Sequence, residues 1–395
     1  MKKPLIVQKF GGTSVGSIER IHTVAKHIIN AKNDGNQVVV VVSAMSGETN
    51  RLMDLAKQVD SVPTARELDV LLSAGEQVSM ALLAMTLNKL GYPARSLTGA
   101  QAGIVTDNVH NDATIKQIDT QLIDELLAED HIVVVAGFQG INEKGDITTL
   151  GRGGSDTSAV TLAGALQADE CQIFTDVNGI YTCDPRVVAN AKKLEVIDFP
   201  SMEEMARKGA KVLHLPSVQY AWQHNVPLRV LSTFDTNPGS LVKGEECQDA
   251  VCGIALQRDM RLISIEKESL ESLKKQCLML GIHLWNVIEH AEWVDVVLKE
   301  DAYSKLELVF KDKIRNSGSV SLLTAVGLHV EGLVEQSCAL LSEVAIDVIH
   351  VSINPQSLTL VVEPESVDKA ANVLHEHYIT SAKAIDCLEK HAFWG

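Results

Sequence analysis

Residues 7–17 read VQKFGGTSVGS, and this stretch decides the fold of the first part of the chain. The apolar run 5–7 in front of it is typical of a strand, and from Ser17 onward apolar residues recur at helical spacing. The glycines between them therefore form a strand-to-helix turn that lets the backbone approach a ligand. Helix-start amides and the positive charge of Lys9 suit an anion, so the pattern predicts a phosphate-binding turn.

Two common phosphate motifs do not fit this turn. A Walker loop needs Lys and then Ser or Thr after its second glycine, whereas here Ser17 and Ile18 follow Gly16. The G-x-G-x-x-G fingerprint of dinucleotide-binding folds is also absent. A glycine turn without a ligand is the alternative, but the lysine ahead of paired glycines and hydroxyls favours phosphate binding.

Composition narrows the class of protein. The chain has 395 residues, 46% of them hydrophobic and 22% charged, which is typical of a soluble globular protein of two or three domains. Its net charge of -16 argues against general binding of nucleic acid or anionic membranes. We expect a cytoplasmic protein, because no leader and no long uninterrupted apolar window is present. The seven cysteines form no C-x-x-C pair, so neither zinc nor a disulfide framework is indicated.

Strand-like runs alternate with helical patterns over residues 1–244. The expected strands are LIVQKF (5–10), QVVVVVSAM (37–45), HIVVVAGFQG (131–140), ECQIFTDV (170–177) and VPLRVLS (226–232). Several are apolar on both faces, as buried parallel strands are. The alternation predicts an α/β fold with a doubly wound, mainly parallel sheet, whose ligands bind at the carboxyl ends of the strands.

Polar motifs follow these strands at the expected place. They are SAMSGETN (43–50), TLGRGGSD (149–156) and TDVNGIYTCDPR (175–186). The second is another glycine-rich turn that leads into a helix start. Two such turns at one sheet edge predict a donor phosphate facing an anionic acceptor.

The composition changes at residues 237–250, NPGSLVKGEECQDA, which are turn-forming and charged residues typical of a linker. Beyond it lie two weakly similar units, each about the size of a ferredoxin-like βαββαβ module. We predict a domain over 1–244, a linker with the first small unit over 245–316, and a second small unit over 317–395. The strand CGIAL (252–256) is a candidate to pair with the second unit, which would intertwine the two.

Six blocks carry a family resemblance: VQKFGGTSVGS, VVSAMSGETN, LLSAGEQVS, TLGRGGSDTSA, TDVNGIYTCDPR and GAKVLH. In this order and spacing they resemble the aspartate kinases of the amino acid kinase family. The resemblance implies a three-layer kinase domain followed by paired ACT domains and assembly into a homodimer or higher oligomer. It also implies transfer of the ATP γ-phosphoryl group, with Mg²⁺ carried mainly by ATP, to the side-chain carboxylate of L-aspartate. That is the first step toward lysine, threonine and methionine.

The resemblance also implies roles for individual residues and assigns no protein ligand to a metal. Lys9 and Asp156 would be catalytic, holding the phosphoryl group and organising the reactants. The aspartate-binding positions would be Thr49, Glu76, Phe138, Arg152 and Ser155. The nucleotide-binding positions would be Lys9, Gly11, Gly12, Thr13, Ser14, Ser43, Thr175, Asp176, Tyr181, Arg186 and Lys211. These roles suit the chemistry, because an ionised carboxylate acceptor needs charge neutralisation and positioning more than a base.

Several alternatives stay open. Asp156 could cap a helix that starts near Thr157. The acceptor could be glutamate or acetylglutamate, or the chain could be a catalytically weak paralogue that acts as a regulatory partner. We assign no chemistry to Cys183 or to His214. His214 is expected to be a partly buried histidine whose ring nitrogens have hydrogen-bond partners.

The two C-terminal units lack one feature of effector-binding relatives. A D-x-P-G-like turn is expected after the first strand, but the sequence reads SIEKESLES (264–272) and AVGLHVEGLVEQ (325–336). The units therefore fit either a dimer interface or a sensor of an amino acid such as lysine or threonine. The chain stops at FWG, which leads us to expect one catalytic activity rather than a fused second enzyme.

Overall fold

The computed structural model describes residues 3–244, 250–328 and 330–381. Part of the predicted linker, 245–249 with Cys247, and the terminal residues with Cys387 lie outside the described residues. Over the described residues the chain divides into two compact units. The first comprises Met1–Ile180, Leu194–Glu203 and Lys211–Glu245, and the second comprises Tyr181–Lys193, Glu204–Ala210 and Glu246–Gly395.

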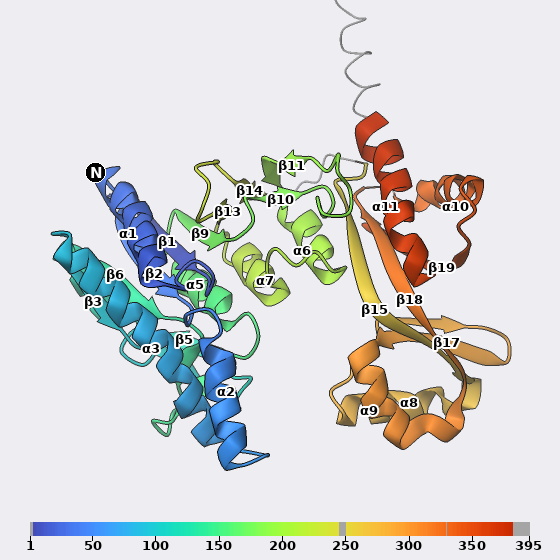
Figure 1. The fold of residues 1–395 in the computed structure, drawn as a ribbon, viewed down its shortest axis with the longest axis horizontal. Coiled ribbons are helices and arrows are strands. Elements are labelled where there is room, and N and C mark those ends of the chain that lie inside the picture. Colours follow the sequence, from blue (N-terminus) through green and yellow to red (C-terminus); the bar gives the residue numbers. More distant parts are fainter. Residues whose placement is uncertain (1–2, 245–249, 329, 382–395) are drawn as a thin grey trace, which may run out of the picture. The chain divides into compact units, whose positions relative to one another are not determined.

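The first unit is built on an eight-stranded sheet (Figure 1). Its order is β12 (Val196–Ile197), β14 (Ser240–Val242), β13 (Leu228–Ser232), β9 (Glu170–Thr175), β1 (Leu5–Phe10), β2 (Gln37–Val42), β6 (Ile132–Ala136) and β3 (Ala94–Leu97). The central strands β9, β1, β2 and β6 are parallel, and β14 runs antiparallel to β13. The predicted doubly wound, mainly parallel sheet is thereby confirmed.

Helices cover both faces of this sheet. The helices along this part of the chain are α1 (Ile18–Asn33), α2 (Glu48–Val59), α3 (Ala65–Lys89), α4 (Gln121–Ala128), α5 (Gly154–Ala165), α6 (Phe199–Arg207) and α7 (Leu215–Gln223). Of these, α2 packs on α3, α7 packs on α5, and α6 is divided between the two units. Side chains of α1 and α3 share one hydrophobic cluster with Val38, Val40 and Val42 of β2. Alternate residues of a strand point to the opposite face, and there α5 packs on β1, β2 and β9. The unit is a three-layer sandwich.

Two smaller sheets flank the main one. A four-stranded sheet has the order β5 (Ile115–Ile118), β4 (Ile104–Thr106), β7 (Gln139–Ile141) and β8 (Ile147–Thr149). A two-stranded sheet pairs β10 (Ile180–Tyr181) with β11 (Lys193–Leu194). The predicted strand 131–140 is two strands, because the chain turns at Gly137 and Phe138 and Phe138 has a positive φ of 68°.

Helix α3 is a core helix. By length and composition alone it could cross a membrane, but half of its most apolar window is buried inside the protein. It contributes Met80, Leu83 and Leu87 to the core cluster, and it also carries the buried acids Asp69 and Glu76. Its apolar character is therefore explained by packing within the first unit.

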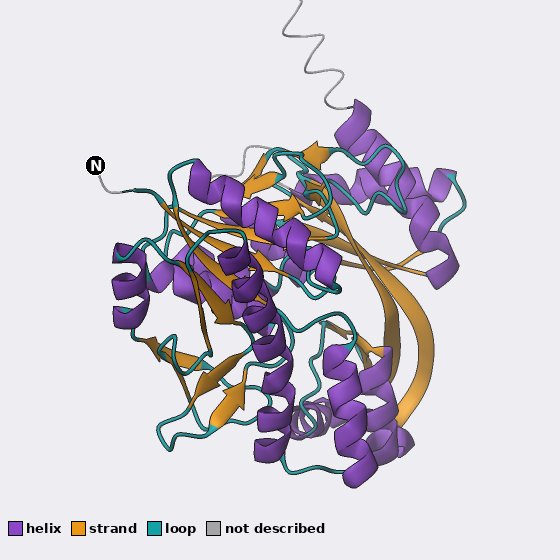
Figure 2. Cartoon of the chain, turned by 60° about the vertical axis from the view of Figure 1, so that its left-hand side comes forward, coloured by secondary structure: helices purple, strands orange, loops and turns teal. Residues whose placement is uncertain are grey.

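The second unit contains one six-stranded antiparallel sheet with helices (Figure 2). Its order is β16 (Asn286–Glu289), β17 (Trp293–Lys299), β15 (Gly253–Glu266), β18 (Ile314–Val326), β20 (Ser357–Val362) and β19 (Val348–Asn354). The helices are α8 (Leu270–Met279), α9 (Glu300–Phe310), α10 (Val334–Glu343) and α11 (Val367–His375), followed by a π-helical turn, Glu376–Ser381.

Two long strands join the predicted small units into one sheet. The first part of β15, from Gly253 to Gln257, pairs with the last part of β18, and its second part pairs with both β17 and β18. The expectation that CGIAL pairs with the second small unit is confirmed. The predicted boundary between residues 316 and 317 falls inside β18, so no linker separates the units there.

Two segments that the sequence placed in the first domain belong to the second unit. Within 181–193, Cys183 and Val188 lie in the hydrophobic cluster of α10, α11, β18 and β20. The Ile254 N–H donates to the Thr182 carbonyl at 2.6 Å, and the Asn372 side chain donates to the Val187 carbonyl. Residues 204–210 belong to this unit as well.

Candidate functional site

The carboxyl ends of β1, β2 and β6 border a pocket of about 350 Å³ in the first unit. The predicted residues that line it are Lys9, Gly12, Ser43, Thr49, Glu76, Phe138, Arg152, Ser155 and Asp156. The lining also includes Ala44, Met45, Ser46, Gly47, Gly151, Gly153 and Gly154, which were not predicted individually. All of the latter fall inside SAMSGETN and TLGRGGSD, so the two motifs had already indicated these residues as parts of the site.

Lys9 and Asp156 form an ion pair at the pocket. Their Nζ and Oδ1 atoms lie 2.6 Å apart, and both side chains are mostly shielded from solvent. Helix α5 begins at Gly154 with Gly153 as its N-cap, and no side chain caps it. The alternative that Asp156 caps a helix starting near Thr157 is therefore wrong, although its charge is still favourable in the first helical turn.

Glu76 is a buried acid with one unused oxygen. It is 3% exposed, and its Oε1 accepts a hydrogen bond from the Ala44 N–H at 3.0 Å. Its Oε2 has no hydrogen-bond partner among the described residues. Burial raises the pKa of Glu76 to about 7, and the Ala44 hydrogen bond opposes this rise. A cationic ligand at this oxygen would therefore gain strongly from pairing with it.

The turn that carries Arg152 needs glycine on both sides. Gly151 and Gly153 have φ angles of 69° and 72°, which side chains rarely adopt. A Cβ on Gly153 would also lie 2.4 Å from Cγ of the His214 ring. This ring packs behind the turn, and its Nδ1 has no hydrogen-bond partner within the described ranges. The expectation of a satisfied His214 is wrong on that point; burial lowers its pKa, and the Asp156 charge opposes this shift.

The first glycine turn has the predicted strand–turn–helix form. Helix α1 starts at Ile18 after Ser17, whose hydroxyl accepts a hydrogen bond from the Arg20 N–H. A Cβ on Gly12 would lie 2.9 Å from the Ala44 carbonyl oxygen, so the turn packs closely against the loop after β2. Ser14 is fully buried and shares a 2.6 Å hydrogen bond with Thr233. Its hydroxyl therefore holds the turn in place.

The remaining nucleotide-binding candidates lie outside the lining of this pocket or in the other unit. In the first unit, Thr175 ends β9 and donates to the carboxylate of the next residue, Asp176, at 3.1 Å, and Lys211 is exposed. Gly11 and Thr13 lie in the first glycine turn but do not line the pocket. Tyr181 and Arg186 belong to the second unit.

Cys183, also in the second unit, is buried, and burial raises the pKa of its thiol to about 12. It is therefore a packed thiol at neutral pH, in keeping with the absence of any chemistry assigned to it. Cys171, Cys252 and Cys277 are buried as well, whereas Cys338 is partly exposed.

Known proteins resemble this chain along its length. The profile of the amino acid kinase family matches residues 4–232. The chain is 44% identical to an aspartate kinase of Pseudomonas putida, over 96% of this chain and 98% of that protein. It is 43% identical to an aspartokinase of Geobacillus stearothermophilus, over 95% of this chain and 97% of that protein.

Solved structures give the same fold. Aspartokinase III of E. coli in complex with aspartate and ADP matches with a TM-score of 0.79 at 24% identity, over 94% of this chain and 99% of that chain. The same enzyme in complex with lysine and aspartate matches with a TM-score of 0.78, also at 24% identity, over 95% of this chain and 99% of that chain. At this identity the likeness establishes the fold.

Proposed function

The chain belongs to the aspartate kinases of the amino acid kinase family, and from that premise we propose how its pocket works. The reaction is transfer of the γ-phosphoryl group of ATP to the side-chain carboxylate of L-aspartate, giving 4-phospho-L-aspartate and ADP. The observation that carries the proposal is the pocket that joins the Lys9–Asp156 ion pair to Glu76 and Arg152.

Recognition of the acceptor follows from two opposite charges in this pocket. We propose that Glu76 pairs through its free Oε2 with the α-ammonium group, and that Arg152 grips the α-carboxylate. Thr49, Phe138 and Ser155 complete the contacts around the substrate. Because the α-groups are held at two fixed points, the side-chain carboxylate is directed toward the phosphoryl group.

Catalysis then depends on neutralising charge. A carboxylate attacking a phosphoryl group brings two anions together, and charge spreads over the phosphoryl oxygens in the transition state. We assign this task to the ammonium group of Lys9, which Asp156 orients through their ion pair. The acceptor is already ionised at neutral pH, so Asp156 does not need to act as a base.

The nucleotide side of the site is also a proposal. Backbone amides of Gly11 and Gly12, with Thr13 and Ser43, are assigned to the ATP phosphates. Thr175, Asp176, Tyr181, Arg186 and Lys211 are assigned to the rest of the nucleotide. Ser14 was predicted among the nucleotide-binding residues, but its hydroxyl is fully buried and hydrogen-bonded to Thr233, so we assign it to holding the turn in place. Mg²⁺ would enter on the ATP phosphates and supply further positive charge there. Two acids line the pocket, and because Glu76 is assigned to the substrate, Asp156 is the one we assign to organising the water around that ion.

The second unit suggests regulation and assembly. We propose that it mediates homo-oligomer formation and that an amino acid, lysine or threonine, acts on it as an effector. Its fold is that of aspartokinases. It also contains the segment 181–193, which carries two of the predicted nucleotide-binding residues, Tyr181 and Arg186. The missing D-x-P-G-like turns make assembly without effector binding the competing role. We also infer a cytoplasmic enzyme that starts the pathway to lysine, threonine and methionine.

The experiment measures aspartyl hydroxamate formed from purified protein, MgATP, L-aspartate and hydroxylamine. Glutamate and N-acetylglutamate replace aspartate in parallel, and lysine, threonine and methionine are added singly. We expect aspartate-selective product that disappears in Lys9→Ala. Product only with glutamate or N-acetylglutamate would move the assignment to another acceptor. Folded protein that binds ATP but gives no product would indicate a regulatory paralogue.

A further inference from the structure

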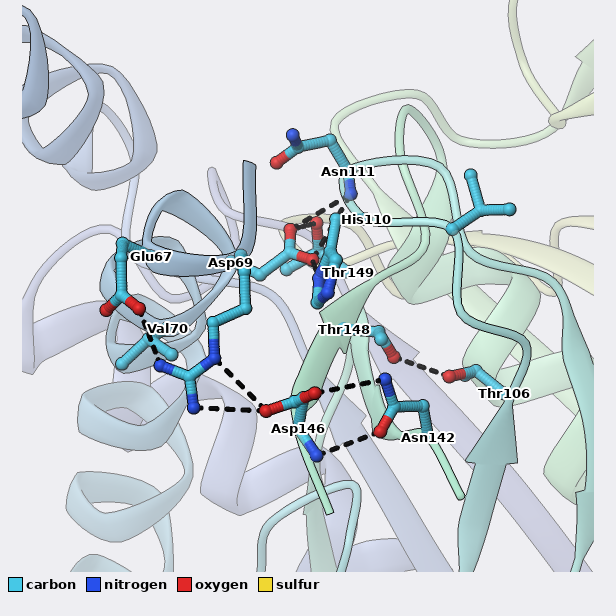
Figure 3. Close-up of polar contacts among 12 residues, drawn as sticks. Glu67, Asp69, Val70, Thr106, His110, Asn111, Asn142, Asp146, Thr148 and Thr149 are labelled. Atoms are coloured by element: carbon cyan, nitrogen blue, oxygen red, sulfur yellow. Dashed lines mark hydrogen bonds and ion pairs between the residues drawn. The ribbon is translucent and has the colours of Figure 1, made fainter. Parts of the chain in front are cut away.

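A second buried acid on α3 lies outside the pocket. Asp69 is fully buried, and three groups point at its carboxylate (Figure 3). Thr149 Oγ1 donates to Oδ1 at 2.5 Å, and His110 Nδ1 lies 2.6 Å from Oδ2. The Asn111 N–H donates to both oxygens, at 3.1 and 3.2 Å. A buried carboxylate that accepts hydrogen bonds from this many donors fixes the groups around it.

These groups belong to two separate segments that meet at the Arg152 turn. Thr149 ends β8, and its carbonyl accepts the Ala113 N–H at 2.9 Å. One residue on, the Leu150 N–H donates to the carbonyl of Phe138, which lines the pocket. A Cβ on Gly151 would lie 2.7 Å from an oxygen of Asp112. The loop 110–113 therefore packs directly against the strand end that leads into the turn.

Helix α3 carries both Asp69, which contacts the end of β8, and Glu76, which lines the pocket. Asp69 and Glu76 are seven residues apart on α3, which places them on the same face about 10 Å apart along the axis. Between them, the Ser73 carbonyl accepts a hydrogen bond from Gln139 at 2.9 Å, so α3 is also tied to β7. The distance from Glu76 to the turn is thus set through α3.

We propose that Asp69 and His110 form a positioning pair, which clamps the end of β8 to α3 and so holds Arg152 at a fixed offset from Glu76. This inference rests on the proposed function, in which these two residues bind the α-groups of the substrate. The pair does not touch the substrate; it determines which length of amino acid presents its side-chain carboxylate to Lys9. Aspartate and glutamate differ by one methylene, so a loosened turn discriminates less between them.

The chain offers a matched control for the test. Asp146, labelled in Figure 3, lies directly before β8 and is also an aspartate in this polar network, but its partner is the solvent-exposed side chain of Arg66. Asp69→Asn and Asp146→Asn make the same chemical change, one at the helix residue that contacts the end of β8 and the other directly before its start. For each variant we would measure kcat, the KM for aspartate, the KM for ATP, selectivity over glutamate and thermal unfolding.

We expect Asp69→Asn to raise the KM for aspartate about tenfold or more and to reduce selectivity, with the KM for ATP changed less than about twofold. Asp146→Asn should match the wild type. Two substitutions of His110 add a second readout. In His110→Asn the amide nitrogen can replace Nδ1 as a hydrogen-bond donor to Asp69, whereas the leucine of His110→Leu has no donor. The first should therefore keep a low KM and the second should lose it.

Clear outcomes would overturn the inference. One is a folded Asp69→Asn or His110→Leu protein with the wild-type KM for aspartate and wild-type selectivity. Another is a general loss, in which the KM for aspartate and the KM for ATP both rise, thermal stability falls, and His110→Asn is as impaired as His110→Leu. If Asp69→Asn does not fold, the two His110 variants decide. A wild-type protein inactive toward aspartate refutes the proposed function instead, before any variant is compared.

Discussion

The substitution Glu76→Gln keeps the size of a buried side chain and removes its charge. Burial raises the pKa of Glu76 from an ordinary 4.5 to about 7. At about 1.4 kcal/mol per pKa unit, this difference amounts to about 3 kcal/mol. The substrate-free enzyme therefore contains a carboxylate that destabilises it at neutral and higher pH, as expected where a cationic ligand is needed to compensate.

The sign of the pH effect on stability follows from the direction of this shift. The pKa is higher in the folded than in the unfolded protein, so the folded state favours the neutral acid. This contribution to stability is complete below about pH 4.5 and is lost as the pH rises through about 7. In urea unfolding without substrates, the free energy of unfolding of the wild type should fall across this window. For Glu76→Gln this fall should be smaller, by up to about 3 kcal/mol.

Kinetics should show the opposite preference, because binding an ammonium group needs the ionised form of Glu76. In the wild type, kcat/KM for aspartate should fall about tenfold per pH unit below pH 7, since this ratio reports the free enzyme. Glu76→Gln should remove that dependence and raise the KM for aspartate about 10- to 100-fold, as expected for a lost hydrogen bond to a charged group. A coupled assay of ADP release measures both quantities.

Glu67→Gln provides the control, because Glu67 lies on the same helix with its side chain 64% exposed. It should change the free energy of unfolding by less than about 0.5 kcal/mol and leave the KM unchanged. A Glu76→Gln enzyme with the wild-type KM for aspartate would refute the assignment. So would a wild-type kcat/KM that stays flat through pH 7.

Further predictions address the other elements of the pocket. Asp156→Asn should lower kcat about 100-fold or more while the protein stays folded, because Lys9 loses the charge that orients it; full turnover would contradict the role of this pair. Gly153→Ala should lower the melting temperature and raise the KM for aspartate, since a Cβ there meets His214 at 2.4 Å. The comparison is Gly145→Ala, where φ is also positive but the space is open, so only the backbone strain of about 1 kcal/mol should appear.

Much of the first unit could be predicted from the sequence because its signals are local. The turn at 11–16, the buried strand β2 and the amphipathic helix α1 each follow from residues adjacent in the chain. The strand ends then bring the predicted motifs to one edge, since parallel strands share their carboxyl side. This geometric rule places Lys9 and Arg152 at one edge of the sheet. Glu76 lies within helix α3, so its place in the site followed from the family resemblance and not from this rule.

Other features could not be predicted because they depend on contacts distant in the sequence. Asp69 meets His110 and Thr149, which lie 41 and 80 residues away. The strands of the four-stranded sheet are three or four residues long, too short for an alternating pattern to be distinctive. The packing of 181–193 in the second unit also depends on partners far along the chain, and a polar loop gives no local sign of it.

Hydrogen bonding distinguishes the two buried acids of α3, which look alike in the sequence. The carboxylate of Asp69 receives the Thr149 hydroxyl, the His110 ring and a backbone N–H, so its charge is used within the protein. Glu76 receives one backbone N–H and keeps an oxygen without a partner among the described residues. Burying a charged group without partners costs free energy that folding alone does not recover. The unsatisfied acid is therefore the one to assign to the substrate, and the satisfied acid is the one to assign to the framework that positions it.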